Sequence, residues 1–570
     1  MAAFLFHRVN FPVFRQLNGA AVNQLSPLDQ HRKTYSPKLP PSLNQGIERV
    51  HLKTGEATKS VKDEGAVREA FPKTYGLPLL SFEAGGSTSP SKPLRVGVVL
   101  SGGQAPGGHN VIAGVFDSIR ALHQESAVYG FIGGPGGLEK GQYEVIGSEK
   151  MDAYRNTGGF DIIGSGRTKL ETPEQFDRCI EVIGRLQLDA VVIIGGDDSN
   201  TNAAILAEYL LGKGLSTCVV GIPKTIDGDL KNARIPTSFG FDTAVKTYSE
   251  LIGNIARDAR SARKYWHFIK LMGRSASHIT LEAGLQTCAN VTLISEEIEE
   301  KKESLDQVVE SVCRSVKARA AQGKDYGVVL VPEGLIEFIP SIKALIAEVN
   351  DLLAEKEKEF VGLNSAEKKV QTLAGWLKPE NAATFRLLPN SIKAQLLLDR
   401  DPHGNVQVSL IETEKLLSEM VGANLKKDPG YKRKFSAQHH FFGYEGRAAA
   451  PTNFDADYCY GLGCVAAVLI RDGKTGYMAS MRNLSKGVEN WEAGGVPITM
   501  LFNMELRHGK LKPVIQKALV DLKGPAFGEL AEHRAAWEIE DAYLYPGPIQ
   551  YFGPADICDA ITKTLSLEMG

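Results

Sequence analysis

The sequence lacks the features that mark several large classes of protein. Only seven of its 570 residues are cysteine, no two form a Cys-x-x-Cys pair, and their odd number and wide spacing argue against a disulfide framework or a zinc site. A formal net charge of −2 gives no support for a nucleic-acid partner. No apolar run approaches the roughly 18 residues that a membrane-spanning helix needs. We therefore expect reduced thiols, a cytoplasmic location, and neither nucleic acid nor membrane among the partners.

Two nucleotide-binding fingerprints are missing as well. The chain contains no complete P-loop and no complete G-x-G-x-x-G. The triplet Gly473-Lys474-Thr475 lacks the upstream glycine of a P-loop and is interpreted as a surface turn. An oxidoreductase built on a dinucleotide-binding sheet is therefore disfavoured.

The first part of the chain carries little periodic pattern. Residues 1–92 are interpreted as an extension, closed by a linker rich in glycine and serine at 85–91. Its start is basic and acid-poor, with Arg8 and Arg15 ahead of the first acid, Asp29. Such a composition is typical of organelle transit peptides, but a flexible leader or docking arm is the preferred interpretation.

From Arg95 onward, short apolar runs alternate with amphipathic segments. The runs at 95–100, 189–194 and 217–222 are rich in valine and isoleucine, which is typical of buried parallel strands. We therefore predict an α/β fold whose mostly parallel sheet has helices on both faces. The stretch 341–429 is rich in charge and in helical pattern but poor in strands, so it is interpreted as a helical insertion.

The first of three polar turns follows the first of these strands and reads SGGQAPGGHN from Ser101 to Asn110. Gly102 and Gly103 let the backbone approach a phosphate closely. Gly107 and the residue after it open the next helix, whose N–H groups and positive end favour an anion. A plain glycine-rich turn between strand and helix is the alternative.

The second turn, Gly195 to Asn200, places Asp197 and Asp198 directly after two glycines. Mg²⁺ prefers carboxylate and phosphate oxygens together, so Asp197 is a candidate ligand. The alternative is a helix cap, in which either acid accepts from the first helical N–H groups.

The third turn, Pro223 to Asp229, carries Lys224, Thr225, Asp227 and Asp229. The lysine is a point cation suited to a phosphate oxygen. The two acids, two residues apart, point the same way in an extended segment, so one is a candidate general base and the other orients water or metal. An Asp-Gly turn or a plain ion-pair cluster is the alternative. Ligands of open α/β sheets lie beyond the carboxyl ends of the strands, where all three turns are expected.

Further polar groups follow or precede later predicted strands. Arginine suits a phosphate there, and glutamate and tyrosine suit sugar hydroxyls. Taken singly, each of these residues is more often structural. They are Lys264, Tyr265, Met272-Gly273-Arg274, Glu333 and the run Tyr444-Glu445-Gly446-Arg447.

Taken together, the three turns and Met272-Gly273-Arg274 resemble the phosphofructokinase family, most closely the catalytic beta subunits of its plant-type, pyrophosphate-dependent branch. The resemblance runs from about 95 to 548 and includes the segment 401–407. It implies two αβα (Rossmann-like) lobes with the active site between them. The implied ranges are 93–260, with later segments returning to it, for a pyrophosphate and magnesium lobe, 261–340 with 430–548 for a fructose 6-phosphate lobe, and 549–570 for a C-terminal segment.

The resemblance also implies an activity: reversible, Mg²⁺-dependent phosphoryl transfer from pyrophosphate to the 1-hydroxyl of fructose 6-phosphate. Asp227 would be the proton acceptor, Asp197 the metal ligand, and Gly103 with Lys224 the pyrophosphate site, with Asp198 a further catalytic residue. Lys264 and Tyr265 would reach the substrate of a neighbouring subunit. The implied substrate-binding residues are Thr225, Ile226, Asp227, Lys264, Tyr265, Met272, Gly273, Arg274, Glu333, Tyr444, Glu445, Gly446 and Arg447.

Two residues bear on the choice of phosphoryl donor. ATP-using relatives carry glycine at the positions of Asp198 and Lys224, which leaves room for the α-phosphate of the nucleotide. Here Asp198 would fill that room and repel the α-phosphate, and such like-charge contacts cost several kcal/mol. Lys224 would neutralise the leaving group of pyrophosphate. An ATP-dependent sugar kinase is therefore disfavoured. One arginine of those relatives is absent from the aligned region 435–440.

The regulatory alpha subunit of the same family is another alternative, because it is a binding subunit with altered acids and lysine in the second and third turns. Here these residues are all present, which favours the catalytic interpretation. The family further implies an oligomer, with a heterotetramer containing an alpha subunit as one form and fructose 2,6-bisphosphate as an activator.

Overall fold

The computed structural model describes residues 26–85, 92–356, 359–360, 362–363, 365–397, 406, 410–507 and 510–547. The basic leader, most of the linker at 85–91, most of 401–407 and the C-terminal segment 549–570 lie outside the described residues. Six of the cysteines fall inside them, and all six are buried and free of disulfides. In the described part of the chain, no helix has the length and apolar character to cross a membrane.

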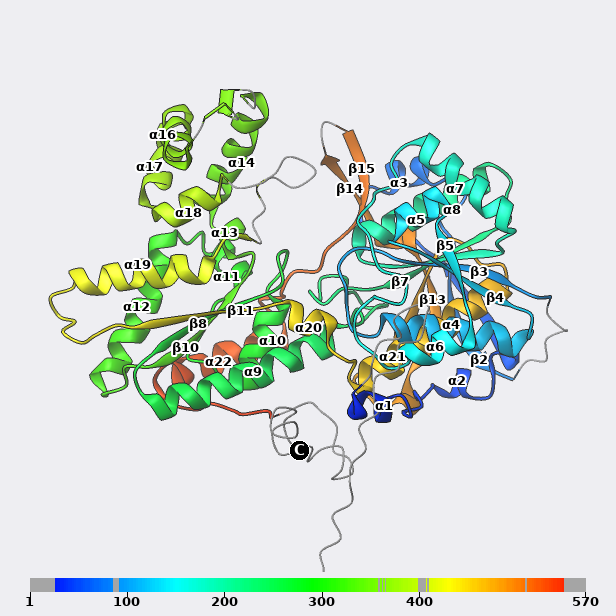
Figure 1. The fold of residues 1–570 in the computed structure, drawn as a ribbon, viewed down its shortest axis with the longest axis horizontal. Coiled ribbons are helices and arrows are strands. Elements are labelled where there is room, and N and C mark those ends of the chain that lie inside the picture. The colour runs from blue at the N-terminus through cyan, green and yellow to red at the C-terminus, as the bar shows by residue number, and fades with distance from the viewer. Residues whose placement is uncertain are drawn as a thin grey trace, which may run out of the picture.

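A nine-stranded sheet forms the core of the first lobe (Figure 1). Three neighbouring strands, at 95–100, 190–195 and 218–223, are parallel, and nearly every residue in them is buried, which explains their continuous valine and isoleucine content. Toward both edges the strands pair antiparallel, so the sheet is mixed and not mostly parallel as predicted. The order across the sheet is β1 (Val50–Ala57), β2 (Pro78–Ala84), β13 (Glu492–Pro497), β12 (Tyr477–Arg482), β7 (Cys218–Pro223), β6 (Ala190–Gly195), β3 (Arg95–Leu100), β4 (Ala127–Phe131) and β5 (Tyr143–Ile146).

This sheet corrects one expected domain boundary and identifies later segments that return to the first lobe. Strands β1 and β2 lie within 1–92, which the sequence pattern indicates as an extension closed by a linker, so this part of the chain belongs to the first lobe. Most side chains of β1 are exposed, so the strand has no apolar alternation to detect. Strands β12 and β13 lie within 430–548 but are segments that return to the first lobe, because Tyr477 of β12 pairs with Val220 of β7.

The second lobe is built on a four-stranded parallel sheet in the order β11 (Ala437–Phe442), β8 (Trp266–Leu271), β10 (Gly327–Pro332) and β9 (Val291–Thr292). Helices cover it, as expected for parallel strands. They include α9 (Phe241–Ala262), α10 (His278–Thr287), α12 (Leu305–Ala321), α19 (Thr413–Lys427) and α22 (Pro525–Ile539).

The stretch predicted as a helical insertion is helical and contains no named strand in the residues that the structure describes. Its apolar side chains share one core with the second lobe, so it is an elaboration of that lobe. Its helices are α14 (Pro340–Glu355), α16 (Ala366–Trp376), α17 (Pro379–Leu387), α18 (Asn390–Gln395) and α19, in green and yellow in Figure 1.

Two helices cross at very short range behind the first sheet. Helix α4 (Gly108–Leu122) packs against α21 (Asn453–Arg471). A Cβ atom added to Gly114 would collide with the carbonyl of Tyr460, and one added to Gly463 would collide with the carbonyl of Val111. Glycine is therefore required at this crossing, because any side chain would push the backbones apart.

A buried carboxylate ties the two lobes together. Asp455, on α21 of the first lobe, accepts hydrogen bonds from Gly240 N at 3.0 Å and Thr243 N at 2.9 Å, at the first turn of α9. It is completely buried, and the hydroxyl of Thr243 donates to it as well. The carboxylate therefore satisfies helix-end donors that no water can reach.

Asp455→Ala is expected to lower the free energy of unfolding by about 3 kcal/mol, because several buried donors lose a charged acceptor at once. Urea denaturation followed by circular dichroism measures this. Asp152→Ala is the matched control, since Asp152 is a mostly exposed acid paired with Arg155 and its loss costs under about 1 kcal/mol. Equal midpoints for the two variants would contradict the anchoring role.

Candidate active site

The three polar turns meet at the carboxyl edge of the first sheet. Strands β3, β6 and β7 run parallel and in register, so their ends lie side by side. Ser199 Oγ donates to Ser101 Oγ at 2.8 Å, joining the second turn to the first. Lys224 N donates to Gly195 O at 3.0 Å, and Lys224 Nζ donates to Gly103 O at 2.7 Å. The sequence prediction that these segments form one site is consistent with these contacts.

The first turn needs its glycines for two different reasons. Gly102 has φ +82° and Gly107 has φ +101°, backbone angles that other residues rarely adopt. At Gly103 the reason is space for an arginine, because the guanidinium group of Arg447 lies where a Cβ atom would be and a side chain there would displace it. Arg447 Nε also donates to Gln104 O at 3.3 Å. An arginine of the second lobe, on α20 (Tyr444–Ala448), thus closes onto the first lobe.

The second turn is held by a buried asparagine. Asn200 Nδ2 donates to the carbonyl oxygens of Gly195 at 2.6 Å and Gly196 at 2.9 Å. The N-cap of α8 (Asp197–Gly212) is Gly196 and has no side-chain cap bond, so the cap alternative for the two acids is not supported. Asp197 and Asp198 instead occupy the first helical turn, where the positive end of the helix favours negative charge.

The third turn buries charge of both signs. Lys224 is 6% exposed, and burial, with Arg447 nearby, lowers its pKa to about 8. Burial, with Glu333 next in importance, raises the pKa of Asp227. Burial, with Asp227 next in importance, raises the pKa of Asp229 to about 6. Buried carboxylates this close together are uncommon outside functional sites.

One detail of the third turn differs from the sequence prediction. Strand β7 ends at Pro223, and Gly228 has φ +74°, so Asp227 and Asp229 do not lie on an extended segment. Thr225 Oγ1 accepts from Asp227 N at 3.1 Å and fixes the bend. The two acids remain close enough for the charge of one to raise the pKa of the other.

The second lobe adds a buried glutamate opposite this turn. Glu333 follows β10, is 4% exposed and accepts from Gly273 N at 2.9 Å. Burial raises its pKa. Arg274, in the turn after β8, is exposed and lowers that pKa in part. Met272 lies beside them, so the predicted Met272-Gly273-Arg274 segment and Glu333 form one group.

The predicted run from Tyr444 to Arg447 is folded around Gly443. Glu445 Oε2 accepts from Gly443 N at 2.8 Å. The ring of Tyr248, from α9, packs against Gly446, and its hydroxyl donates to Gly443 O at 2.6 Å. Tyr444 is 69% exposed. Of the remaining predicted residues, Thr225 is half-buried and Ile226 is 4% exposed in the third turn.

Lys264 and Tyr265 are the predicted site residues that this chain does not bring to the others. They precede β8 (Trp266–Leu271), whereas Met272 follows it. At about 3.3 Å per residue, the six residues of the strand separate the two ends by roughly 20 Å. Lys264 Nζ lies 5.1 Å from the ring centroid of the adjacent Tyr265.

Sequence reasoning missed three basic residues at the site. Lys517 Nζ lies 3.5 Å from Asp197 Oδ2 and 3.7 Å from Asp229 Oδ2. Lys169 Nζ lies 3.5 Å from Asp198 Oδ2, and Arg167 contributes to the lowered pKa of Lys224. The last two follow a Gly-Ser-Gly segment, which was an available signal for an anion site. Lys517 had no such signal.

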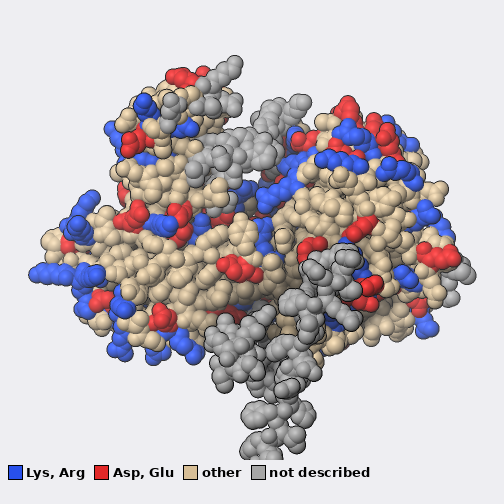
Figure 2. All heavy atoms as spheres, in the orientation of Figure 1, with Lys and Arg blue, Asp and Glu red and all other residues tan. Residues whose placement is uncertain are grey.

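The carboxylates around Lys517 suit a hard divalent cation. Asp197 and Asp229 face the same ammonium group, which marks a place where two carboxylate oxygens already hold positive charge. Mg²⁺ takes oxygen ligands of this kind. Figure 2 shows lysine and arginine side chains gathered in the hollow where the two lobes meet, so negatively charged ligands are also favoured there.

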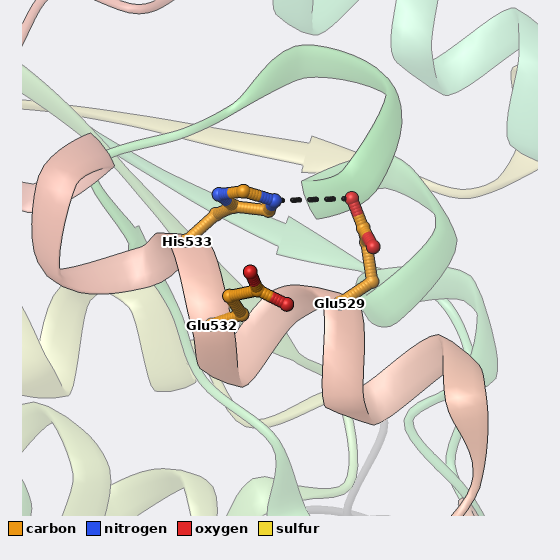
Figure 3. Close-up of side chains that lie close together, drawn as sticks. All are labelled: Glu529, Glu532 and His533. Carbon is orange, nitrogen blue, oxygen red and sulfur yellow. Dashed lines mark ion pairs between the residues drawn. The ribbon is translucent and has the colours of Figure 1, made fainter.

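A second group of acids lies elsewhere. Glu529, Glu532 and His533 share one face of α22, with His533 Nε2 3.3 Å from Glu529 Oε1 (Figure 3). Both glutamates are exposed, and the imidazole stacks on Trp537 with ring centroids 5.7 Å apart. An exposed i,i+4 pair is ordinary on a helix surface, so this group is not a candidate metal centre.

The fold and the site together define a class of protein, a two-lobed α/β phosphotransferase. Its features are a mixed and a parallel sheet, glycine turns against a closing arginine, buried acids and a buried lysine. A family model described as Phosphofructokinase matches residues 95–470. The chain belongs to the phosphofructokinase family.

Curated relatives are similar along nearly the whole chain. A protein of Porphyromonas gingivalis named pyrophosphate–fructose 6-phosphate 1-phosphotransferase is 54% identical, over 95% of this chain and 99% of its own. The subunit beta 2 of the enzyme of that name in Arabidopsis thaliana is 50% identical, over 90% of each chain. The crystal structure of a pyrophosphate-dependent phosphofructokinase from Nitrosospira multiformis aligns with a TM-score of 0.52 at 17% identity, over 78% of this chain and 92% of that one. The last likeness shows the fold.

Proposed function

We propose that this chain reversibly transfers a phosphoryl group from pyrophosphate to the 1-hydroxyl of fructose 6-phosphate, giving fructose 1,6-bisphosphate and phosphate. The observation that carries the proposal is Lys224, a buried cation at the junction of all three turns, with Nζ 2.7 Å from Gly103 O. A buried lysine there can neutralise a small inorganic anion. The names of the two curated relatives support the same donor and acceptor.

The donor end of the site is formed by the first and third turns. Gly103 lets the backbone approach a phosphoryl group, and Lys224 neutralises the phosphate that leaves. Asp198 lies at the first turn of α8, where it would repel the α-phosphate of a nucleotide. Phosphoryl transfer is mostly positioning and charge neutralisation, so these groups suffice for the donor side.

The acceptor end contains the base. Asp227 takes the proton of the sugar 1-hydroxyl, and its raised pKa suits a base that must release this proton again in the reverse reaction. Arg274 and Arg447 bind the sugar phosphate, while Glu333 accepts from a sugar hydroxyl. The other residues that line this end are Thr225, Ile226, Met272, Gly273, Tyr444, Glu445 and Gly446.

Mg²⁺, when bound, would neutralise charge on the pyrophosphate oxygens. Asp197 would hold it, and Asp229 is the second carboxylate within reach of the same position. Asp229 is buried, which strengthens its charge interactions at the site.

The enzyme works as an oligomer in this proposal. Lys264 and Tyr265 lie at the far end of β8 and serve the substrate of a second chain. A partner of the alpha type is one form of this oligomer, and fructose 2,6-bisphosphate is its proposed activator.

The deciding experiment compares pyrophosphate with ATP on the purified chain, with fructose 6-phosphate and Mg²⁺, in the presence and absence of fructose 2,6-bisphosphate. We expect turnover with pyrophosphate only. Turnover with ATP would overturn the roles of Asp198 and Lys224. The absence of turnover with both donors would overturn the proposed function, unless an added alpha-type subunit restores activity.

A further inference from the structure

A short segment crosses from the first lobe to the second beside the three turns. We call residues 516–520 the cleft strap; it follows β15 (Lys510–Ile515), the second strand of a hairpin with β14 (Phe502–Arg507). Figure 1 shows the chain descending from this hairpin toward the other lobe.

Backbone hydrogen bonds fasten the cleft strap to both lobes. On the first lobe, Gln516 N donates to Leu501 O at 3.0 Å and Ala518 N donates to Asp229 O at 2.7 Å. On the second lobe, His278 Nε2 donates to Ala518 O at 2.9 Å. Val520 N donates to the buried Glu296 Oε1 at 3.0 Å. The position of the strap is therefore fixed relative to both walls of the site.

The side chain of Lys517 enters the site from the cleft strap. Its Nζ donates to Ser275 Oγ at 2.8 Å and lies within 3.7 Å of a carboxylate oxygen of both Asp197 and Asp229. The side chain is 35% exposed. These contacts place one ammonium group between the first lobe, which supplies the acids, and the second, which supplies the serine.

A purely structural ion pair does not require this arrangement. One acid is enough to pair a lysine, whereas here two acids from different turns share one ammonium group with Asp227 close by. A divalent cation held by Asp197 would lie too near this ammonium group, because like charges at such range cost several kcal/mol. Lysine is a compact charge on a flexible stem, so it can move a short distance to the nearest anion.

We propose that Lys517 is a pyrophosphate-binding residue of the active site, which occupies the cation position between Asp197 and Asp229 until metal and pyrophosphate enter together. The proposal rests on the proposed function. Its consequence is ordered binding: Lys517 opposes the entry of free metal and favours the entry of metal with pyrophosphate. Because the cleft strap spans both lobes, this exchange also links the donor site to the position of the sugar-binding lobe.

The test uses two binding measurements that need no turnover. Free Mn²⁺ is titrated into the full-length enzyme without substrates and followed by electron paramagnetic resonance. Imidodiphosphate, a pyrophosphate analogue that resists transfer, is titrated with saturating Mg²⁺ by calorimetry. For Lys517→Met we expect Mn²⁺ to bind about tenfold more tightly and imidodiphosphate at least tenfold more weakly. Lys517→Arg keeps the charge, so its affinities for Mn²⁺ and imidodiphosphate should lie between those of the unmodified enzyme and those of Lys517→Met.

Lys512→Met is the matched control, because Lys512 lies on the same hairpin and pairs at 2.9 Å with Glu171, an acid that belongs to none of the three turns. It should change neither affinity. Lys517→Gln, which can still bond Ser275, replaces the methionine variant if that one does not fold. Unchanged affinities would overturn the proposal, and so would tighter Mn²⁺ binding with unchanged imidodiphosphate binding. If the unmodified enzyme binds fructose 6-phosphate but no imidodiphosphate, the proposed donor fails, and the role of Lys517 fails with it.

Discussion

Asp227→Asn is expected to lower kcat by about 10²- to 10⁴-fold, the usual contribution of a positioned general base. Asparagine has nearly the same shape, so the turn held by Thr225 should persist and both substrates should still bind. Steady-state assays with pyrophosphate and fructose 6-phosphate measure the loss. Asp177→Asn is the control, because Asp177 is a half-exposed acid on a distant helix that bonds Tyr209.

The pH profile provides a second readout of the same residue. The pKa of Asp227 is raised, so its basic form is lost, as the pH falls, at a higher pH than for an ordinary aspartate. The acid limb of kcat/KM should therefore lie at a higher pH than an ordinary aspartate would give, and it should change in Asp227→Asn. A folded variant that keeps more than a tenth of normal kcat would show that the base lies elsewhere.

The double variant Asp198→Gly with Lys224→Gly is expected to lose activity with pyrophosphate and to gain activity with ATP. Loss of the buried ammonium removes a charge-assisted contact of about 1.5–3 kcal/mol, so kcat/KM for pyrophosphate should fall roughly 10- to 150-fold. Loss of the acid removes like-charge repulsion of several kcal/mol from a nucleotide, so measurable turnover with ATP should appear.

Asp198→Asn separates charge from volume in this second prediction, because it removes the negative charge while keeping the size of the side chain. ATP turnover in that variant would assign the selection mainly to repulsion. The two single glycine variants measure each residue alone. If the double variant gains no ATP turnover, these two residues do not select the donor, although the fold and the site would stand.

The central part of the fold could be predicted because its signals are local. Strands β3, β6 and β7 are buried on both faces and are continuous in apolar residues, and their polar turns follow directly in the chain. The edge strand β1 is mostly exposed, so its residues carry no apolar alternation. The membership of β12 in the first sheet depends on pairing with β7, more than 250 residues earlier, which no local pattern encodes.

The residues of the candidate site also differ in how far the sequence indicates them. The acids and lysine of the second and third turns were found because glycines and strand ends surround them in sequence. Lys517 was missed because only the long-range hydrogen bonds of the cleft strap bring it to Asp197 and Asp229. The sequence also did not indicate that Gly103 makes room for Arg447, because Arg447 belongs to the other lobe.

The placement of β12 and β13 has a consequence for synthesis on the ribosome. The first lobe begins before residue 60 of the chain, yet the strands that join β2 to β7 emerge only at 477–497. Until then a nascent chain carries two unpaired strand edges, one on each side of the missing pair, and such edges invite pairing with other chains. The second lobe is also incomplete until then, because α22 is synthesised after both strands. The last fifth of the chain thus completes both lobes nearly together, and the growing polypeptide depends longest on protection against aggregation at β2 and β7.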